Sequence, residues 1–212
     1  MSKLETNTID TVSGTSTLQV GSTNTTTITL GASGDTVDVP SGATFDATGA
    51  TITGITQGIT LADQWHVTAA VTDIAANTDT VVTNWTQDGY GEDGRIGTMS
   101  ESSGIFTFPS TGIYLVELAL TYYYQSAASN YNYARLQITT NNSSYNTRAE
   151  TTNFTRAAEN YITTSPVSII IDVTDTSNVK VRPVAHVRNA GTDLEGGSIV
   201  RSYIKFIRLG DT

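Results

Sequence analysis

The stretch that decides the fold runs from Gly112 to Tyr124 and reads Gly-Ile-Tyr-Leu-Val-Glu-Leu-Ala-Leu-Thr-Tyr-Tyr-Tyr. Side chains along a β-strand point alternately to opposite faces, so residues two apart share a face. One face here is entirely apolar or aromatic, and its members are Tyr114, Val116, Leu118, Leu120, Tyr122 and Tyr124. The pattern predicts a strand over 112–124 whose first face packs in the core of a β-sandwich.

The opposite face of this strand is only half apolar. Its members are Ile113, Leu115, Glu117, Ala119, Thr121 and Tyr123. A carboxylate such as that of Glu117 is costly in a dry core, yet the face is too apolar to be simply wet. A contact between subunits explains this mixture, and so does cover by a loop of the same chain.

Turn residues separate further short runs that are rich in β-branched and aromatic residues, a pattern typical of strands. The strands predicted in this way cover 64–71, 80–85, 96–99, 104–108, 133–139, 145–151, 161–172, 178–187 and 198–209. No long window has the apolar spacing of a helix. Residues 61–212 are therefore predicted to form one all-β sandwich.

Charge and aromatic content divide the chain near residue 60. Lys3 is the only basic residue before Arg95, and Phe45 is the only aromatic residue before Trp65. We predict a docking segment and stem over 1–60 and a head domain over 61–212.

The predicted stem contains short apolar-polar-apolar triplets, such as Ile28-Thr29-Leu30 and Val37-Asp38-Val39, between Gly- and Ser-rich turns. Each triplet directs two apolar side chains to one face. Two side chains cannot offset the entropy of ordering about ten residues at ~1–2 kcal/mol each. Several copies winding together could bury the triplets as an intertwined β stem. A Gly/Ser/Thr linker is the alternative.

Composition excludes several classes of partner. The chain has 212 residues, a formal net charge of −9 and no cysteine. Nucleic acid and anionic lipid would repel so acidic a chain. Disulfides and thiolate metal sites are excluded. No apolar run approaches the ~18 residues that cross a bilayer, so no membrane insertion is predicted.

Residues suited to catalysis are scarce. Neither His66 nor His186 has a partner at metal-ligand spacing, and no cysteine is available as a nucleophile. The acidic loop 88–93 could hold a cation through oxygen ligands, although a solvated hairpin tip also accounts for it. We therefore predict no enzyme, no catalytic residue, no cofactor and no metal. A glycosidase, which needs two carboxylates across a cleft, is the remaining enzymatic alternative.

Two features could serve recognition. The strand over 178–187 places Lys180, Arg182, His186 and Arg188 on one face, where they could hold an acidic glycan or a neighbour's carboxylates, or could be a solvated face. Tyrosines surround a polar loop between 122 and 133, and tyrosine is enriched in recognition surfaces, although core packing also explains several of them. Loops near 126–132, 141–144 and 190–197 are expected to face a partner. The candidate surface-recognition residues are Asn130, Tyr131, Asn142, Tyr145, Arg182 and Arg188.

Residues 104–116 resemble the early core of C1q/TNF-like jelly rolls, in which a strand ending in Phe and Pro leads through a Gly turn into a strand bearing Tyr. The matching residues are Phe106, Phe108, Pro109, Gly112 and Tyr114. Later segments that also resemble this family are 165–172, 178–187 and 202–209. The resemblance implies a ten-stranded jelly roll, a compact homotrimer and recognition through surface loops.

With a trimer implied, the candidate residues for the core or the trimer interface are Tyr114, Val116, Leu118, Tyr122, Tyr123 and Tyr124.

The N-terminal segment resembles the stems of fibre and accessory virion proteins of tailed phages, above all marine and cyanobacterial ones. The residues that carry this likeness lie at 3–9, 27–37 and 39–44. It implies a protein that is assembled in the host cytoplasm, docks on another virion protein through residues 1–60 and is exposed on the particle. We expect a trimeric tail fibre or adhesin that binds a host-surface glycan or protein. A capsid decoration protein that stabilises the shell is the alternative, and a surface-polysaccharide depolymerase is a third.

Overall fold

The computed structural model describes residues 20, 27–30, 33–48, 50, 58–87, 94–126, 128–156 and 162–212. The chain divides into two compact units, Met1–Gly54 and Ile55–Thr212. Several predictions fall wholly or partly outside the described residues. They are the docking segment and stem at 1–19, 21–26, 31–32, 49 and 51–57, the acidic loop 88–93, residue 127 of the loop predicted over 126–132, and the first residue of the strand predicted from Tyr161.

The described residues of the first unit form turns and extended chain without a strand. Local hydrogen bonds occur among them. The Asp46 carboxylate accepts from the Thr48 hydroxyl and backbone N–H, which hold the pKa of Asp46 below its ordinary value. Large apolar side chains are exposed, and they include Val20, Ile28, Leu30, Val37, Val39 and Phe45. A single chain therefore leaves its triplets unburied, and the intertwined stem stays a prediction.

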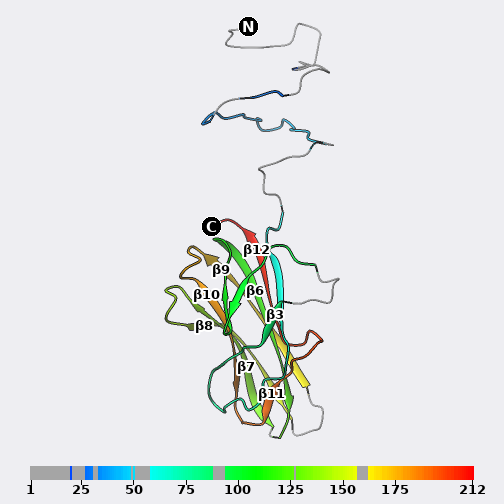
Figure 1. The fold of residues 1–212 in the computed structure, drawn as a ribbon, viewed down its shortest axis with the longest axis vertical. Helices are drawn as coiled ribbons and strands as arrows, with labels where there is room; N and C mark the ends of the chain where they lie inside the picture. Colours follow the sequence, from blue (N-terminus) through cyan, green and yellow to red (C-terminus); the bar gives the residue numbers. More distant parts are fainter. Residues whose placement is uncertain are drawn as a thin grey trace. The chain divides into compact units, whose positions relative to one another are not determined.

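The second unit consists of two antiparallel sheets, and its described residues contain no helix (Figure 1). The first sheet runs from β9 (Ile162–Val173) through β6 (Gly112–Tyr124), then β12 (Tyr203–Gly210) with β11 (Thr192–Leu194) along the same side of β6, then β1 (Ala62–Val67) and β3 (Trp85–Gln87). The second sheet runs through β4 (Ser100–Ser102), β5 (Ile105–Thr107), β10 (Lys180–Val187), β7 (Ser129–Thr139) and β8 (Asn146–Thr155), with β2 (Thr80–Val81) beside β10.

The core lies between the two sheets and is centred on β6. The predicted inner face of this strand is buried, with Tyr114, Val116, Leu118, Leu120 and Tyr122 all 0% exposed. An aromatic cluster continues the core, in which the ring of Phe106 lies 5.5 Å from Trp65 and 5.1 Å from Phe206. Edge-to-face and tilted aromatic pairs at this separation add to the free energy of burial.

Two glycines of the family-like segment hold conformations that favour glycine. Gly104 has a φ of +80°, and a Cβ there would lie 2.5 Å from the carbonyl oxygen of Val82. Gly112 has a φ of +143°, and a Cβ there would lie 2.5 Å from the carbonyl oxygen of Gly210. Both positions lack room for a side chain, so glycine sets the entry into β5 and into β6.

The predicted strand over 112–124 is confirmed at both ends by β6. The strand predicted over 96–99 is wrong, because Ile96 makes only an isolated bridge to Ala62 and the next strand, β4, begins at Ser100. The loop predicted over 126–132 is shorter than expected, because β7 begins at Ser129 through pairing with Thr155. The loop predicted over 190–197 contains β11, whose three residues are buried.

At 96–99 the strand fails because Gly97 has a φ of +67°, which is not a strand conformation. The two loop corrections share another physical reason. Asn, Ser and Gly have weak intrinsic preference for strands, so the sequence reads as loop at these places. Pairing with distant strands overrides that preference. β11, for example, pairs with Tyr122–Tyr124 at the end of β6.

Candidate functional site

The outer face of the second sheet carries the predicted basic stripe. Val181, Ala185 and Val187 of β10 are in the core, so the residues between them point outward. The outward side chains of β10 and of the segments beside it are called the recognition face. Its members are Lys180, Arg182, His186, Arg188, Tyr131, Tyr133, Arg135, Gln137, Tyr145 and Glu150, with Asp79 from the segment before β2.

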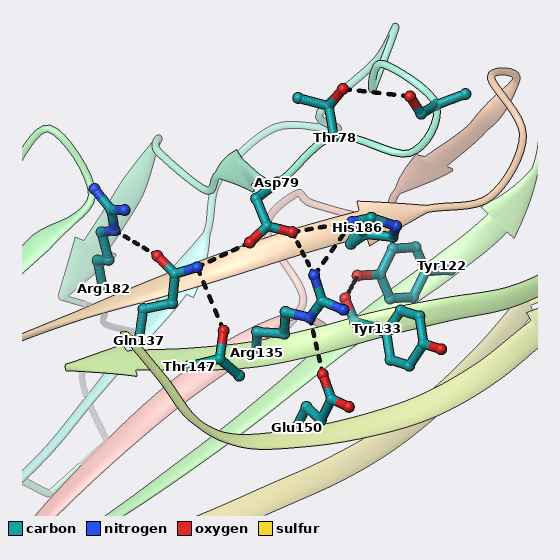
Figure 2. Close-up of polar contacts among 11 residues, drawn as sticks. Thr78, Asp79, Tyr122, Tyr133, Arg135, Gln137, Thr147, Glu150, Arg182 and His186 are labelled. Carbon is teal, nitrogen blue, oxygen red and sulfur yellow. Dashed lines mark hydrogen bonds and ion pairs between the residues drawn. The ribbon is translucent and has the colours of Figure 1, made fainter. Parts of the chain in front are cut away.

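The centre of the recognition face is a closed polar network (Figure 2). Arg135 forms ion pairs with Asp79 and with Glu150, the latter at 2.9 Å, and its guanidinium lies 4.5 Å from the centre of the Tyr133 ring. Asp79 also contacts His186 Nδ1 at 2.9 Å. Burial disfavours the charge on Arg135, but the two carboxylates outweigh burial and raise the pKa of the guanidinium. The charges at the centre are therefore paired within the chain.

The two sides of the recognition face differ from its centre. Arg182 lies 4.1 Å from the centre of the Tyr145 ring and donates through Nε to the side-chain amide oxygen Oε1 of Gln137 at 2.8 Å. Arg188 lies 5.6 Å from the Tyr131 ring and donates to the hydroxyl of that tyrosine at 3.2 Å. The structure thus brings together four of the six candidate recognition residues as two Arg–Tyr pairs.

The other two candidate recognition residues are not members of these Arg–Tyr pairs. Asn130 is exposed near the start of β7. Asn142 is exposed in the turn between β7 and β8, where it has a φ of +52°. A positive φ of this size is a conformation that asparagine adopts more readily than most residues. The recognition face therefore does not include them.

Four of the candidate core or interface residues serve the core of a single chain. Tyr114, Val116, Leu118 and Tyr122 are fully buried, so they are not available to a partner. The Tyr122 hydroxyl donates to the Tyr133 carbonyl oxygen at 2.6 Å and so joins β6 of one sheet to β7 of the other. Burial raises the pKa of Tyr122 far above its ordinary value, which keeps this donor protonated.

Tyr123 and Tyr124 are only partly buried. The Tyr123 hydroxyl donates to Asp193 Oδ2 at 3.4 Å, and the Tyr124 hydroxyl donates to the Ser126 carbonyl oxygen at 3.2 Å. Burial raises the pKa of Tyr123, as does the neighbouring Asp193 carboxylate. Both rings lie at the end of β6 beside β11.

The outer face of the first sheet has an open apolar area. Leu115 of β6 lies directly between Ile170 of β9 and Ile207 of β12. Ile170 is 63% exposed, and Ile113 continues the row along β6. We call these four residues the association face.

Polar groups near the association face are satisfied within the chain. The Glu117 carboxylate accepts from the Tyr203 hydroxyl at 3.0 Å and pairs with Lys205 Nζ at 3.3 Å. Thr121 donates to the Arg201 carbonyl oxygen at 2.8 Å, and its backbone N–H donates to Ser202 Oγ at 3.0 Å. A loop of the same chain therefore covers the Thr121 end of β6, whereas the Leu115 end is open.

Sequence reasoning missed three buried or bridging carboxylates. Asp63 is 5% exposed and accepts from Trp65 Nε1, Gln87 Nε2 and the backbone N–H of Met99 at 2.7–2.9 Å. Asp79 meets Arg135 across 56 residues of sequence. Asp193 is buried in β11, where it accepts from the backbone N–H of Asp73 at 3.2 Å. Apart from Trp65, which is two residues from Asp63, these partners are distant in the sequence, so no local pattern could reveal them.

The described ranges contain no group of three or more His, Asp or Glu side chains placed to hold a metal ion. Within the same ranges, no helix has the length and apolarity needed to cross a membrane.

No protein-family model and no curated protein matches the chain. Solved structures do resemble it. Murine APRIL, crystallised at pH 5.0, aligns with a TM-score of 0.51 and 11% identity over 70% of this chain and 98% of that one. Eiger TNF from S. frugiperda aligns with a TM-score of 0.50 and 15% identity over 74% of this chain and 96% of that one. Identities this low show the fold alone. They confirm the prediction of an all-β jelly-roll sandwich of the C1q/TNF-like kind.

Proposed function

We propose that this protein is a non-enzymatic, homotrimeric fibre protein of a virus particle, with the first unit as docking segment and stem and the second unit as a binding head. The observation that carries the proposal is apolar surface left uncovered by a single chain. In the first unit Phe45 is 71% exposed and Leu30 is 67% exposed. In the second unit Ile170 of the association face is 63% exposed, and Ile113, Leu115 and Ile207 beside it are partly exposed.

A second copy is the natural cover for the association face. Exposed apolar surface of this kind marks an interaction site. Covering the face leaves no buried carboxylate unpaired, because Glu117 already has Tyr203 and Lys205 as partners. Burial gains about 25 cal/mol for each Å² of apolar surface removed from water.

The same reasoning supports an assembled stem. The exposed triplets of 27–48 have no core of their own, and winding copies together would remove them from water. The likeness of this segment to phage stems supports a place on a virion. Three heads on one stem would strengthen weak single contacts with a host surface through multivalency.

The association face can be tested by substitution. We expect Leu115→Arg to raise the protein concentration at which the trimer dissociates, because only the stem still holds the copies, while the circular dichroism spectrum of the head stays unchanged. Thr152→Arg, at an exposed position of β8 in the other sheet, is the matched control and should stay trimeric. Native mass spectrometry gives the state directly. A wild-type chain that is monomeric at micromolar concentration would contradict the proposal.

The place on the virion needs a separate measurement. Antibody labelling of intact particles should mark the tail if the protein is a host-binding fibre. Labelling spread over the capsid would instead favour the alternative role as a shell-stabilising decoration protein. Release of fragments from host surface polysaccharide by the purified protein would contradict the non-enzymatic assignment.

A further inference from the structure

Three cations of the recognition face lie outside its paired centre, in two groups on either side of it. Lys180 and Arg182 lie at one side, and Arg188 lies at the other. In the described part of the chain none of the three forms an ion pair with a carboxylate. Their hydrogen bonds go to neutral groups, namely Thr107 for Lys180, Gln137 for Arg182, and Asn77 and Tyr131 for Arg188.

Both arginines are held in place with hydrogen-bond donors to spare. The guanidinium of Arg182 lies 4.1 Å from the centre of the Tyr145 ring, and that of Arg188 is held by hydrogen bonds to Asn77 and to the Tyr131 hydroxyl. Arg182 uses only Nε within the described chain, and Arg188 uses only its Nη1 side-chain donor. A fixed guanidinium with free donors is suited to bidentate binding of a carboxylate.

The spacing of these cations restricts the ligand. Arg182 and Arg188 are six residues apart along β10 and the residue after its end, which corresponds to about 20 Å at ~3.3 Å per residue. Between them lie the carboxylates of Asp79 and Glu150, which are 37% and 45% exposed and would repel an anion at the centre. A fitting ligand has anionic groups at two separated places and neutral, hydrogen-bonding groups between.

A nucleic acid does not meet this requirement. Each strand carries one phosphate about every 3.4 Å of helix axis in a duplex, so phosphates would fall on the central carboxylates. A polysaccharide with carboxylates on some of its sugars does meet it. Its hydroxyls could bond to the exposed hydroxyl of Thr147 beside Gln137 (Figure 2).

We propose that the recognition face binds a linear carboxylated polysaccharide laid along β10, with carboxylates held by Arg182 and Lys180 at one side and by Arg188 at the other. The proposal names the ligand class for the host-binding head and rests on that function. The chain between the two carboxylates lies over the Asp79–Arg135–Glu150 network.

The test measures binding of the full chain to polyuronate oligomers of graded length, with neutral dextran, dextran sulfate and a single-stranded oligonucleotide as comparison probes. Oligomers that span about 20 Å, the distance set by the strand rise, should bind more tightly than shorter ones. Arg182→Gln and Arg188→Gln should each weaken binding of long oligomers roughly tenfold, which corresponds to about 1.4 kcal/mol. Arg95→Gln removes the same charge at an exposed position outside the recognition face and should leave binding unchanged.

Several results would overturn the proposal. They are equal binding of short and long oligomers, an equal loss in Arg95→Gln, and binding of dextran, dextran sulfate or the oligonucleotide as tightly as the polyuronate. Thermal melting of each variant checks that it is folded. The oligomeric state is measured on the same samples, so that failure of the ligand proposal can be told from failure of the proposed function. A trimer that does not bind polyuronate refutes only the proposed ligand class.

Discussion

The two units of the chain treat the same kinds of residue in opposite ways. Phe45 of the first unit is 71% exposed, whereas Phe106 of the second is fully buried. Val37 and Val39 are exposed, whereas Val179 and Val181, equally spaced, are buried. Residue type alone therefore does not determine whether a side chain of this protein is buried.

The difference lies in how far the alternating pattern extends. β6 keeps its apolar alternation over 13 residues, so every second residue that is ordered in the strand adds buried apolar surface. The triplets of the first unit stop after two apolar side chains. Burying these two side chains does not offset the entropy lost by ordering the turn that follows. Short patterns need partners, and long ones can form a core alone.

The largest effect should come from a matched pair of phenylalanines. Phe106→Ala should lower the free energy of unfolding of the head by about 3–5 kcal/mol, because it leaves a cavity in the aromatic cluster. Phe45→Ala should leave that free energy unchanged, because its side chain lies outside the core. Urea denaturation followed by tryptophan fluorescence measures both. Equal losses would remove the distinction between the units.

The next largest effect should come from comparing a buried aspartate of the head with an exposed aspartate of the first unit. Asp63→Ala should destabilise the head by about 3 kcal/mol, since it removes the acceptor of the buried Met99 backbone N–H and of the part-buried donors of Trp65 and Gln87. Asp38→Ala, at an exposed position in the first unit, should stay within about 0.5 kcal/mol of the wild type. Differential scanning calorimetry would show the contrast. A drop of similar size for Asp38→Ala would mean that the first unit is packed after all.

The head also contains a carboxylate that opposes its stability at neutral pH. Burial raises the pKa of Asp193, so its protonated form is favoured by folding and its ionised form is disfavoured. The contribution of Asp193 to the stability of the head is therefore most favourable when the pH is below about 3.9, the carboxyl pKa in the unfolded chain. It is lost as the pH rises through the higher pKa of Asp193 in the folded head.

Asp193→Asn should therefore stabilise the head at neutral pH, on the order of 1 kcal/mol. The amide oxygen can still accept from the backbone N–H of Asp73. Below about pH 3.5, under the ordinary carboxyl pKa, the advantage should vanish. Thermal melts across this pH range test the sign, and a constant difference at all pH values would refute the explanation by ionisation.

The smallest effect concerns a polar site inside the head. Asn132 and Asn153 are cross-strand partners, both are buried, and their amide groups make no hydrogen bond within the described chain. Replacing both by valine removes two unsatisfied polar groups, so we expect a change between neutral and about 1 kcal/mol more stable. A clear loss of stability would show instead that ordered water bridges the amides.

Local patterns were enough to predict the strands that fill the core. Alternation over 112–124 gave both ends of β6, and the alternation around Val181 gave the outward row that contains Arg182. The pairing of Arg182 with Tyr145 did not follow, since it depends on the register between β7 and its neighbours. Likewise, Asp79 reaches His186 across 107 residues, and no window of sequence contains both.

The proposed fibre function depends most on the first unit acquiring structure only when copies associate. Hydrogen exchange of the backbone amides of 27–48, measured on the full chain over a range of protein concentrations, tests this directly. We expect protection at micromolar concentration that is lost on dilution together with the trimer. Protection that does not change with concentration, or no protection in an intact trimer, would contradict the claim.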